Sequence, residues 1–426
     1  MSTIFNKGWI RLDTAALIFP ATMNSKWSNV FRLSATLKED IDPDILQKAV
    51  DDLRERFPSF YVGLKYGFFW CYLQRSKTNP KVQMDYSYPL TYMGKKELRK
   101  NCLRVLYYKK RIAIELFHSI GDGNSARIFL CSLIGHYLKL KKAVEYQYND
   151  LFLDINQKPS EDELKDRFKE FSNNYPASRK EENSFKLKGT RISYYFSVLT
   201  TGIVSTDQLL EKAHKYNCTI TVYLAAIMCQ SLIELQNQKV ASSRRKAVKV
   251  TIPVNLRKVF NTTTLRNFVL TVNIGVNPKK GEYSLQELCN ELTHQLAYET
   301  TSHNMASRIA ANVNPEINKY LRMFPIFVKN AIMNFVYRSA GEKKGSLNIS
   351  NLGNTNINGI LKDEIERMEF IIGVQKSYPN NCGVISYNGK TYINMIRNIK
   401  ESQLEYLFFT RLVKEGVGVK IESNWR

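Results

Sequence analysis

The spacing of apolar residues predicts alternating strands and helices in the first third of the chain. A strand is expected over 27–37, and Asp42-Pro43-Asp44 then begins a helix, because aspartate caps helices and proline fits their first turn. Strands 103–108 and 111–118 are joined at Lys109-Lys110. A glycine-rich turn over 121–124 leads into an apolar helix over 125–140. This order is typical of an α/β fold.

The C-terminal part repeats the same order. Val384–Tyr387 and 390–396 flank Asn388-Gly389, a two-residue sequence that favours a tight hairpin turn. A helix begins near Ser402 and stops at Gly416. Strand, turn, strand and helix thus occur twice, at 103–140 and 384–415, which predicts two similar lobes with a cleft between them. The remaining expected elements are helices over 206–216, 219–236, 284–300, 305–312 and 315–337 and strands over 59–65, over 68–74, from about 191, over 248–257, over 345–351 and over 417–423.

Residues 156–189 differ in character from both flanks. Of these 34 residues, 15 are charged, and few are large and apolar. Such a stretch is typical of a linker or a surface excursion. We therefore expect an N-terminal lobe over 1–155, a charged linker over 156–189 and a C-terminal lobe over 190–426.

Composition and charge limit the kinds of molecule that the protein is expected to bind. The 426 residues are 44% hydrophobic and 12% aromatic, which excludes a disordered chain. Lys and Arg total 62 against 39 Asp and Glu, a net charge of +23 that favours anionic partners. No zinc-finger spacing or RNA-recognition motif accompanies this charge, so we expect no nucleic acid as a partner.

The sequence also indicates the compartment. The most apolar stretch, Phe324–Tyr337, is interrupted by Lys329 and is shorter than the roughly 20 residues of a membrane span. The N-terminus lacks the pattern of a signal peptide. The seven cysteines are odd in number and show no CxxC spacing, which favours buried free thiols. A cytoplasmic protein without a transmembrane segment is expected.

His118 is the candidate catalytic residue. It ends a predicted strand and is followed by Gly121-Asp122-Gly123, so its side chain can project into a cleft. A histidine with a pKa near 6.5 is a usable base at neutral pH. A core histidine on an apolar strand face is the plainer alternative. A metal site is not expected, because no further His or Cys lies nearby in the sequence.

The sequence around His118 resembles the HHxxxDG signature of the chloramphenicol acetyltransferase-like acyltransferase superfamily, with Phe117 in place of the first histidine. Pro253-Val254-Asn255-Leu256-Arg257 resembles a second stretch of that superfamily. Residues 9–13, 264–268 and 350–353 are most similar to bacterial alcohol acetyltransferases. The resemblance implies an α/β fold of two similar lobes, with mixed sheets flanked by helices and an active-site tunnel at their interface.

The resemblance also implies a mechanism. His118 acts as general base without an acyl-enzyme, and Asp122 has a structural role through a pair with Arg257. An acyl group, for which acetyl is one candidate, passes from acyl-coenzyme A as co-substrate to a small alcohol or amine. We expect no bound cofactor. The alternatives are a condensation-type or polyketide-associated enzyme that takes its acyl group from an acyl carrier protein, and a binding protein with a vestigial site.

Two further sets of residues are weaker candidates, each with a plain structural alternative. The phosphates of coenzyme A can be bound by four basic residues, Arg244, Arg245, Lys246 and Lys249. The alternative is that these side chains only form a hydrated surface where a strand begins. Ser346, Ser350 and Asn351 can stabilise the oxyanion or serve as ordinary strand and turn residues. The acceptor, the acyl chain length and the oligomeric state are left open by the sequence.

Overall fold

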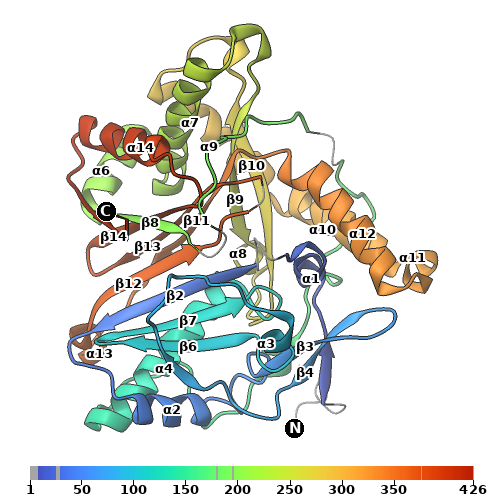
Figure 1. Ribbon diagram of the computed structural model, residues 1–426, viewed down its shortest axis with the longest axis vertical. Coiled ribbons are helices and arrows are strands. Elements are labelled where there is room, and N and C mark those ends of the chain that lie inside the picture. The colour runs from blue at the N-terminus through green and yellow to red at the C-terminus, as the bar shows by residue number, and fades with distance from the viewer. Residues whose placement is uncertain (1–7, 25–28, 179–180, 194–195, 376, 426) are drawn as a thin grey trace.

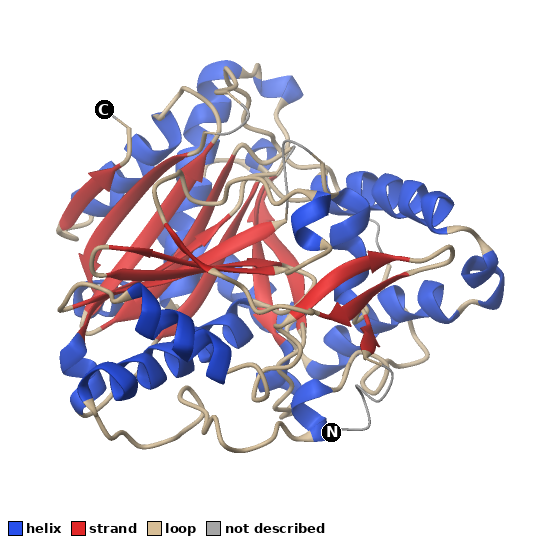
Figure 2. Ribbon diagram, turned by 60° about the horizontal axis from the view of Figure 1, so that its bottom comes forward, coloured by secondary structure: helices blue, strands red, loops and turns tan. Residues whose placement is uncertain are grey.

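The computed structural model describes residues 8–24, 29–178, 181–193, 196–375 and 377–425 (Figure 1). Two mixed β-sheets lie one above the other in this view, each with helices on its outer side (Figures 1 and 2). A third, small sheet has the order β1-β4-β3, with β1 Trp9–Arg11, β3 Val62–Tyr66 and β4 Cys71–Arg75. The expected α/β class with mixed sheets flanked by helices is confirmed.

The smaller of the two main sheets has the strand order β12-β2-β7-β6-β5. Its strands are β2 Val30–Leu37, β5 Val82–Met84, β6 Leu103–Tyr108, β7 Arg111–Phe117 and β12 Ile365–Ile372. Helices α2 Pro43–Asp52 and α4 Gly123–Lys142 pack beneath it, while α3 Lys95–Leu98 and α13 Ile360–Glu364 lie at its margins (Figure 1). Asp42 caps α2 by accepting hydrogen bonds from the backbone of Asp44 and Ile45, as the sequence predicts.

The larger sheet has the order β10-β9-β11-β13-β14-β8-β15. Its strands are β8 Val198–Ser205, β9 Val248–Asn255, β10 Val269–Val276, β11 Leu347–Asn354, β13 Asn380–Tyr387, β14 Lys390–Arg397 and β15 Val419–Ser423. The helices that accompany it are α6 Thr206–Lys215, α7 Ile220–Lys239, α8 Leu256–Phe260, α9 Leu285–Glu299, α10 Ser302–Ile317 and α14 Gln403–Lys414. A core of apolar side chains from α7, α9, α10 and α14 covers this sheet.

Strand β12 joins the two lobes. It lies in the second half of the chain, within the expected range 190–426, yet it pairs antiparallel with β2 from Val30 to Leu37 and forms one edge of the smaller sheet. It also crosses β13 so closely that a Cβ on Gly383 would stand 2.3 Å from the carbonyl oxygen of Phe370. Glycine is therefore required at 383 for the sheets to approach.

Most predicted elements are confirmed. The repeated order of strands and helix is β6, β7 and α4 in one lobe and β13, β14 and α14 in the other. The hairpin turn has left-handed φ values at Asn388 (48°) and Gly389 (73°). Asp122 caps α4.

Two expectations are wrong, and two strands are missing from the prediction. The single helix expected over 315–337 is interrupted, because α10 ends at Ile317, α11 covers Lys319–Met323 and α12 covers Ile326–Val336 after Pro325. The strand expected from Arg191 begins at Val198, and Arg191 forms only an isolated bridge with Ile399. Strands β10 and β12 were not predicted.

The described residues contain no single helix that is both long and apolar enough to cross a membrane. One bent pair of helices, Thr206–Lys215 with Ile220–Lys239, satisfies the length and composition criteria. Its second member is a core helix of the large sheet, with twelve buried residues.

Candidate active site

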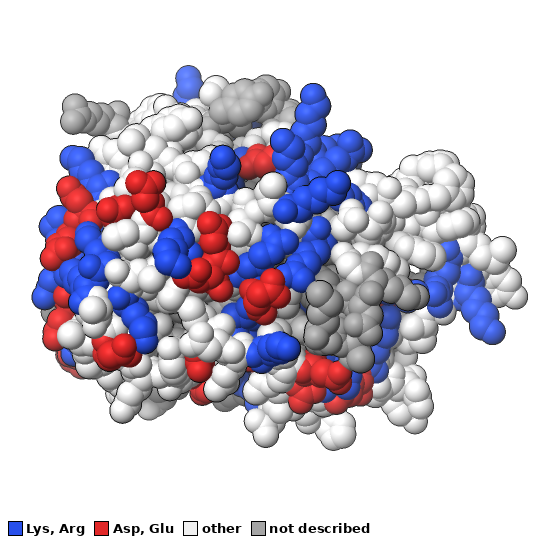
Figure 3. Space-filling model, turned by 90° about the horizontal axis from the view of Figure 1, so that it is seen from below, with Lys and Arg blue, Asp and Glu red and all other residues white. Residues whose placement is uncertain are grey.

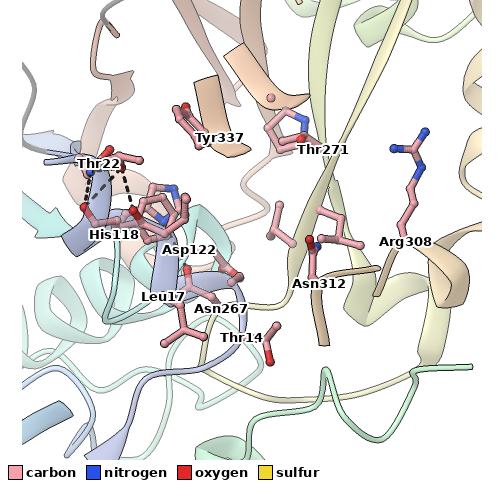
Figure 4. A pocket seen from close by; sticks show the side chains of 18 of the residues that line it. Thr14, Leu17, Thr22, His118, Asp122, Asn267, Thr271, Arg308, Asn312 and Tyr337 are labelled. Carbon is pink, nitrogen blue, oxygen red and sulfur yellow. Dashed lines mark hydrogen bonds between the residues drawn. The ribbon is translucent and has the colours of Figure 1, made fainter. Parts of the chain in front are cut away.

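A cavity of about 1180 Å³ lies between the two lobes. Both lobes contribute to its wall, with His118 and Asp122 from one lobe and Pro253, Asn267 and Ser350 from the other. Figure 4 shows His118, Asp122 and Asn267 together on one side, with Thr271, Asn312 and Arg308 across the pocket. The volume exceeds the roughly 300–1,000 Å³ of common ligand pockets, so the cavity is large enough for more than one small molecule.

His118 stands directly after β7, in the turn before α4. Its backbone N–H donates to the carbonyl of Asn29 at 2.9 Å. The imidazole stacks on Phe19 with ring centroids 4.4 Å apart and also contacts Phe31 at 4.8 Å. These contacts fix the ring at the wall of the cavity while it keeps partial exposure.

Asn267 determines which ring nitrogen of His118 holds the proton. Its side-chain Nδ2 donates to Asp13 Oδ2 at 3.2 Å, so its Oδ1 faces Nδ1 of His118, 3.3 Å away. An amide oxygen can only accept, so Nδ1 carries the hydrogen and Nε2 carries the lone pair. No described residue hydrogen-bonds Nε2.

The electrostatic environment keeps His118 neutral. Burial lowers the pKa of His118 from its usual 6.5, while a hydrogen bond to its own backbone, the charge of Asp122 and the contact with Asn267 oppose this shift. Neutral imidazole is the form that a general base needs at pH 7. The arrangement can therefore accept a proton at Nε2.

The carboxylate of Asp122 points away from Nε2 of His118 and into the protein. Its Oδ2 accepts from Arg257 Nη1 at 2.8 Å and from the backbone of Phe268 at 2.9 Å. Its Oδ1 accepts from the backbone and hydroxyl of Ser125 at 3.1 and 3.0 Å. Burial alone would raise the pKa of Asp122, but the charge of Arg257 and these hydrogen bonds hold it below its usual value.

Arg257 links this carboxylate to the segment that carries Asn267. It donates from Nε to the carbonyl of Thr264 and from Nη2 to the carbonyl of Arg266, both at 2.6 Å. Both members of the ion pair are buried. The structure thus brings together three of the residues singled out from the sequence: His118 beside the cavity, Asp122 in the same turn, and Arg257 behind it.

The oxyanion candidates separate into two groups. Ser350 and Asn351 line the cavity on β11. Asn351 also donates to the hydroxyl of Thr221 at 3.0 Å. Ser346 does not line the cavity; it is buried and its hydroxyl accepts from the backbone of Lys249 at 3.3 Å. Stabilisation of an oxyanion by Ser350 or Asn351 stays a prediction.

The basic cluster that the sequence predicts to bind the coenzyme lies outside the lining of the cavity. Arg244 ends a short 3₁₀ turn over Ser242–Arg244, and none of Arg244, Arg245 and Lys246 lines the cavity. Lys249 stands on β9 within 3.7 Å of Glu181. Its role and that of the cluster stay predictions, and other cations, including Arg127 and Lys258, do line the cavity.

Asp13 and Asn267 were not identified as site residues from the sequence, although both belong to stretches that carry the family resemblance. Asp13 is buried and also accepts from the backbone of Ala16 at 2.8 Å. Burial raises its pKa, and Arg266 at 3.5 Å opposes the shift. Among the described residues no three His, Cys, Asp or Glu side chains gather as a metal site.

No family model and no curated protein matches the chain by sequence. Solved structures match over almost the whole chain. TRI101 of F. sporotrichioides, complexed with coenzyme A and T-2, is 11% identical, with a TM-score of 0.66 and coverage of 96% of this chain and 99% of that one. Polyketide synthase associated protein 5 from Mycobacterium tuberculosis is 14% identical, with a TM-score of 0.57 and coverage of 94% and 96%.

A further neighbour is the epimerization domain of the third module of tyrocidine synthetase B, 13% identical, with a TM-score of 0.59 and coverage of 96% of both chains. Identities this low show the fold alone. The chain therefore has the two-lobed, mixed α/β fold of chloramphenicol acetyltransferase-like and condensation-type proteins.

Proposed function

We propose that the protein is an acyltransferase that moves an acyl group from coenzyme A to an alcohol. The observation that carries this proposal is the state of His118. Its pKa is lowered, its Nδ1 proton is directed to Asn267, and its Nε2 is left as the basic nitrogen at the wall of the cavity between the lobes.

The proposed reaction needs one base and no acyl-enzyme. Nε2 of His118 takes the proton of the acceptor hydroxyl as its oxygen attacks the thioester carbonyl. The tetrahedral intermediate then collapses, the carbon–sulfur bond breaks, and the imidazolium returns the proton to the departing thiolate. General-base catalysis of this kind contributes about 10²–10⁴-fold.

Asp122 and Arg257 have a positioning role in this scheme. All the hydrogen bonds found for the Asp122 carboxylate run to Ser125, Arg257 and Phe268, so it is not placed to exchange protons with substrate. The pair holds the turn of His118 against the segment that carries Asn267. This interpretation agrees with the role implied by the sequence resemblance.

A second candidate is transfer from a carrier-protein thioester to form an ester or an amide. The net charge of +23 favours it, since carrier proteins are usually acidic, and one structural neighbour is described as polyketide synthase associated. The chemistry at His118 would be the same, and only the donor would differ.

The test is release of free thiol from a panel of acyl-coenzyme A donors, with and without alcohols and amines. We expect acceptor-dependent release from at least one acyl-coenzyme A. Release only from a loaded carrier protein would favour the second candidate. No release from either donor type would favour a binding protein with a vestigial site.

A further inference from the structure

Helix α12, Ile326–Val336, exposes large apolar side chains, although Ile326, Met333 and Val336 line the cavity. Eight of its eleven residues are apolar and none is buried. Phe327 and Phe335, two turns apart on one face, are 69% and 73% exposed. A surface helix of a soluble protein normally shows the opposite arrangement, with its polar face in water.

The polar residues of α12 are turned toward the protein instead. Lys329 donates to the carbonyl of Phe69 at 2.8 Å, and Asn334 donates to the carbonyl of Ala21 at 3.2 Å. The helix is therefore anchored through its polar groups. Because its orientation is fixed by these contacts, the outward apolar face is a built feature of the fold.

Two neighbouring segments extend this face. The backbone of Ile326 donates to the carbonyl of Phe68 in the β3–β4 turn at 2.8 Å, and α11 precedes α12 directly. Tyr320 and Met323 on α11 are 81% and 74% exposed. Figure 1 shows α11, α12 and the β3–β4 turn projecting from the same side of the molecule. We call the following exposed residues the tip patch: Phe68, Phe69, Trp70, Tyr320, Met323, Phe324, Phe327, Ile332 and Phe335.

The two segments that carry the tip patch have charges of one sign. Residues 317–341 contain Lys319, Arg322, Lys329 and Arg338 and no Asp or Glu, and 59–70 contain Lys65 and no acidic residue. On the face seen in Figure 3, the part that projects to the right carries basic but no acidic side chains. A second copy of the chain would bring like charges together, which disfavours a dimer through this face.

We infer that the tip patch docks the protein on an anionic membrane surface. Aromatic side chains flanked by Lys and Arg are the combination that binds the interface of a bilayer. At eleven residues α12 is too short to span a membrane and suited to lie in the interface. Exposed apolar side chains gathered on one projecting part of a protein mark an interaction site.

The docking surface continues into the cavity. Phe69, Trp70, Phe324 and Ile332 belong to the tip patch and also line the cavity that contains His118. If the proposed acyl transfer holds, an apolar substrate dissolved in the bilayer can enter without crossing water. Only this consequence rests on the proposed function, since docking itself does not depend on turnover.

The experiment is sedimentation of the full chain with vesicles, so it needs no substrate. We expect the protein to pellet with vesicles of equimolar phosphatidylglycerol and phosphatidylcholine, to remain in solution with phosphatidylcholine alone, and to be released by salt. The variants Phe327→Ser/Phe335→Ser and Lys319→Glu/Arg338→Glu should each weaken binding by about tenfold.

Matched controls lie on other elements. Tyr86 and Tyr406 are 84% and 68% exposed, and Lys414 and Lys420 are exposed at the far side of the large sheet. The variants Tyr86→Ser/Tyr406→Ser and Lys414→Glu/Lys420→Glu should bind vesicles as the parent does. Thermal unfolding of all four variants near the parent temperature shows that binding, not folding, is measured.

A tryptophan reporter gives a second readout. After the emission of the parent is subtracted, the tryptophan fluorescence of Phe327→Trp should shift to shorter wavelengths when anionic vesicles are added. The fluorescence of Tyr406→Trp, treated in the same way, should not shift. Absence of parent binding to anionic vesicles would overturn the inference. Equal losses in patch and control variants would also overturn it, as would a dimer in solution that Phe327→Ser/Phe335→Ser abolishes while vesicles bind neither form.

Discussion

Asn267 and His118 are 149 residues apart in sequence, and the amide oxygen of one lies 3.3 Å from Nδ1 of the other. The amide cannot turn round without loss, because its nitrogen donates to the buried carboxylate of Asp13. Asp13, Asn267 and His118 therefore form a chain of three side chains from three distant segments. This chain makes Asn267 a positioning residue for the base.

Removal of this amide should reduce turnover. We expect Asn267→Ala to lower kcat by about 10²-fold with little change in acceptor KM, since a misplaced base loses its geometry rather than its ability to bind substrate. The acid limb of the pH profile should also move to lower pH, because Asn267 helps to stabilise protonated His118. A loss of kcat with an unchanged acid limb and a lowered melting temperature would indicate packing alone.

The pH dependence follows from the lowered pKa of His118. Its usual pKa is 6.5, and burial places it below that value in the folded protein. A general base acts in its neutral form, so activity should rise with pH through this pKa and reach its plateau at a lower pH than it would with a base of the usual pKa. Measurement of kcat/KM over about pH 5 to 8 tests this. A midpoint above 6.5 would contradict the assignment.

Replacement of the base itself should remove most of the rate. We expect His118→Ala to lower kcat by about 10²–10⁴-fold. The fold should persist, since the side chain is partly exposed to the cavity and, among the described residues, its ring contacts are those with Phe19 and Phe31. Near-ultraviolet circular dichroism serves as the folding control. Turnover within about tenfold of the parent would contradict the role of His118.

The Asp122–Arg257 pair should couple stability to rate. Asp122→Ala leaves a buried guanidinium unpaired, which typically costs about 3–5 kcal/mol. Urea unfolding of Asp122→Ala, Arg257→Ala and the double variant gives the coupling energy. We expect the double variant to be much less destabilised than the sum of the single ones. Strict additivity in stability and in kcat would exclude the pairing as a functional unit.

Two alternative groups of basic residues are candidates for binding the phosphates of the donor. Lys258 on α8 is exposed and lines the cavity, whereas Arg244, Arg245 and Lys246 do not line it. We expect Lys258→Glu to raise the KM of acyl-coenzyme A, with kcat at saturation little changed. The KM of an acyl-pantetheine that lacks the nucleotide phosphates should not rise.

Charge reversal at Arg244, Arg245 and Lys246 is the comparison. If this triple variant raises the KM of acyl-coenzyme A more than Lys258→Glu does, the cluster predicted from the sequence is the coenzyme site. If all variants affect both donors equally, neither set contacts the nucleotide phosphates.

Local sequence signals predicted the elements around His118 well. The Asp42 and Asp122 caps and the Asn388-Gly389 turn depend on short-range chemistry that any reader of the chain can identify. The division of 315–337 by Pro325 was missed because the apolar residues there continue across the break. A pattern of apolar spacing does not distinguish a helix that faces the core from one that faces outward.

The parts of the fold and of the site that depend on contacts between distant residues were harder to predict from the sequence. Strand β12 pairs with β2, which lies more than three hundred residues earlier in the sequence, and nothing in the sequence of β12 indicates that β2 is its partner. Asp13 and Asn267 are ordinary polar residues in the sequence, and their roles arise only where three segments meet. The resemblance to a known superfamily supplied the pairing of Asp122 with Arg257, which apolar spacing alone could not.

The position of β12 also has a consequence for how the chain is made. The N-terminal lobe begins with strands that leave the ribosome early, yet its sheet has an unpaired edge along β2 until residues 365–372 have been synthesised. Apolar side chains of the same late segment, including Met368 and Phe370, complete the core of that lobe. The N-terminal lobe can therefore not mature by itself, and a nascent chain arrested before β12 would expose a strand edge, the feature through which partly folded chains aggregate.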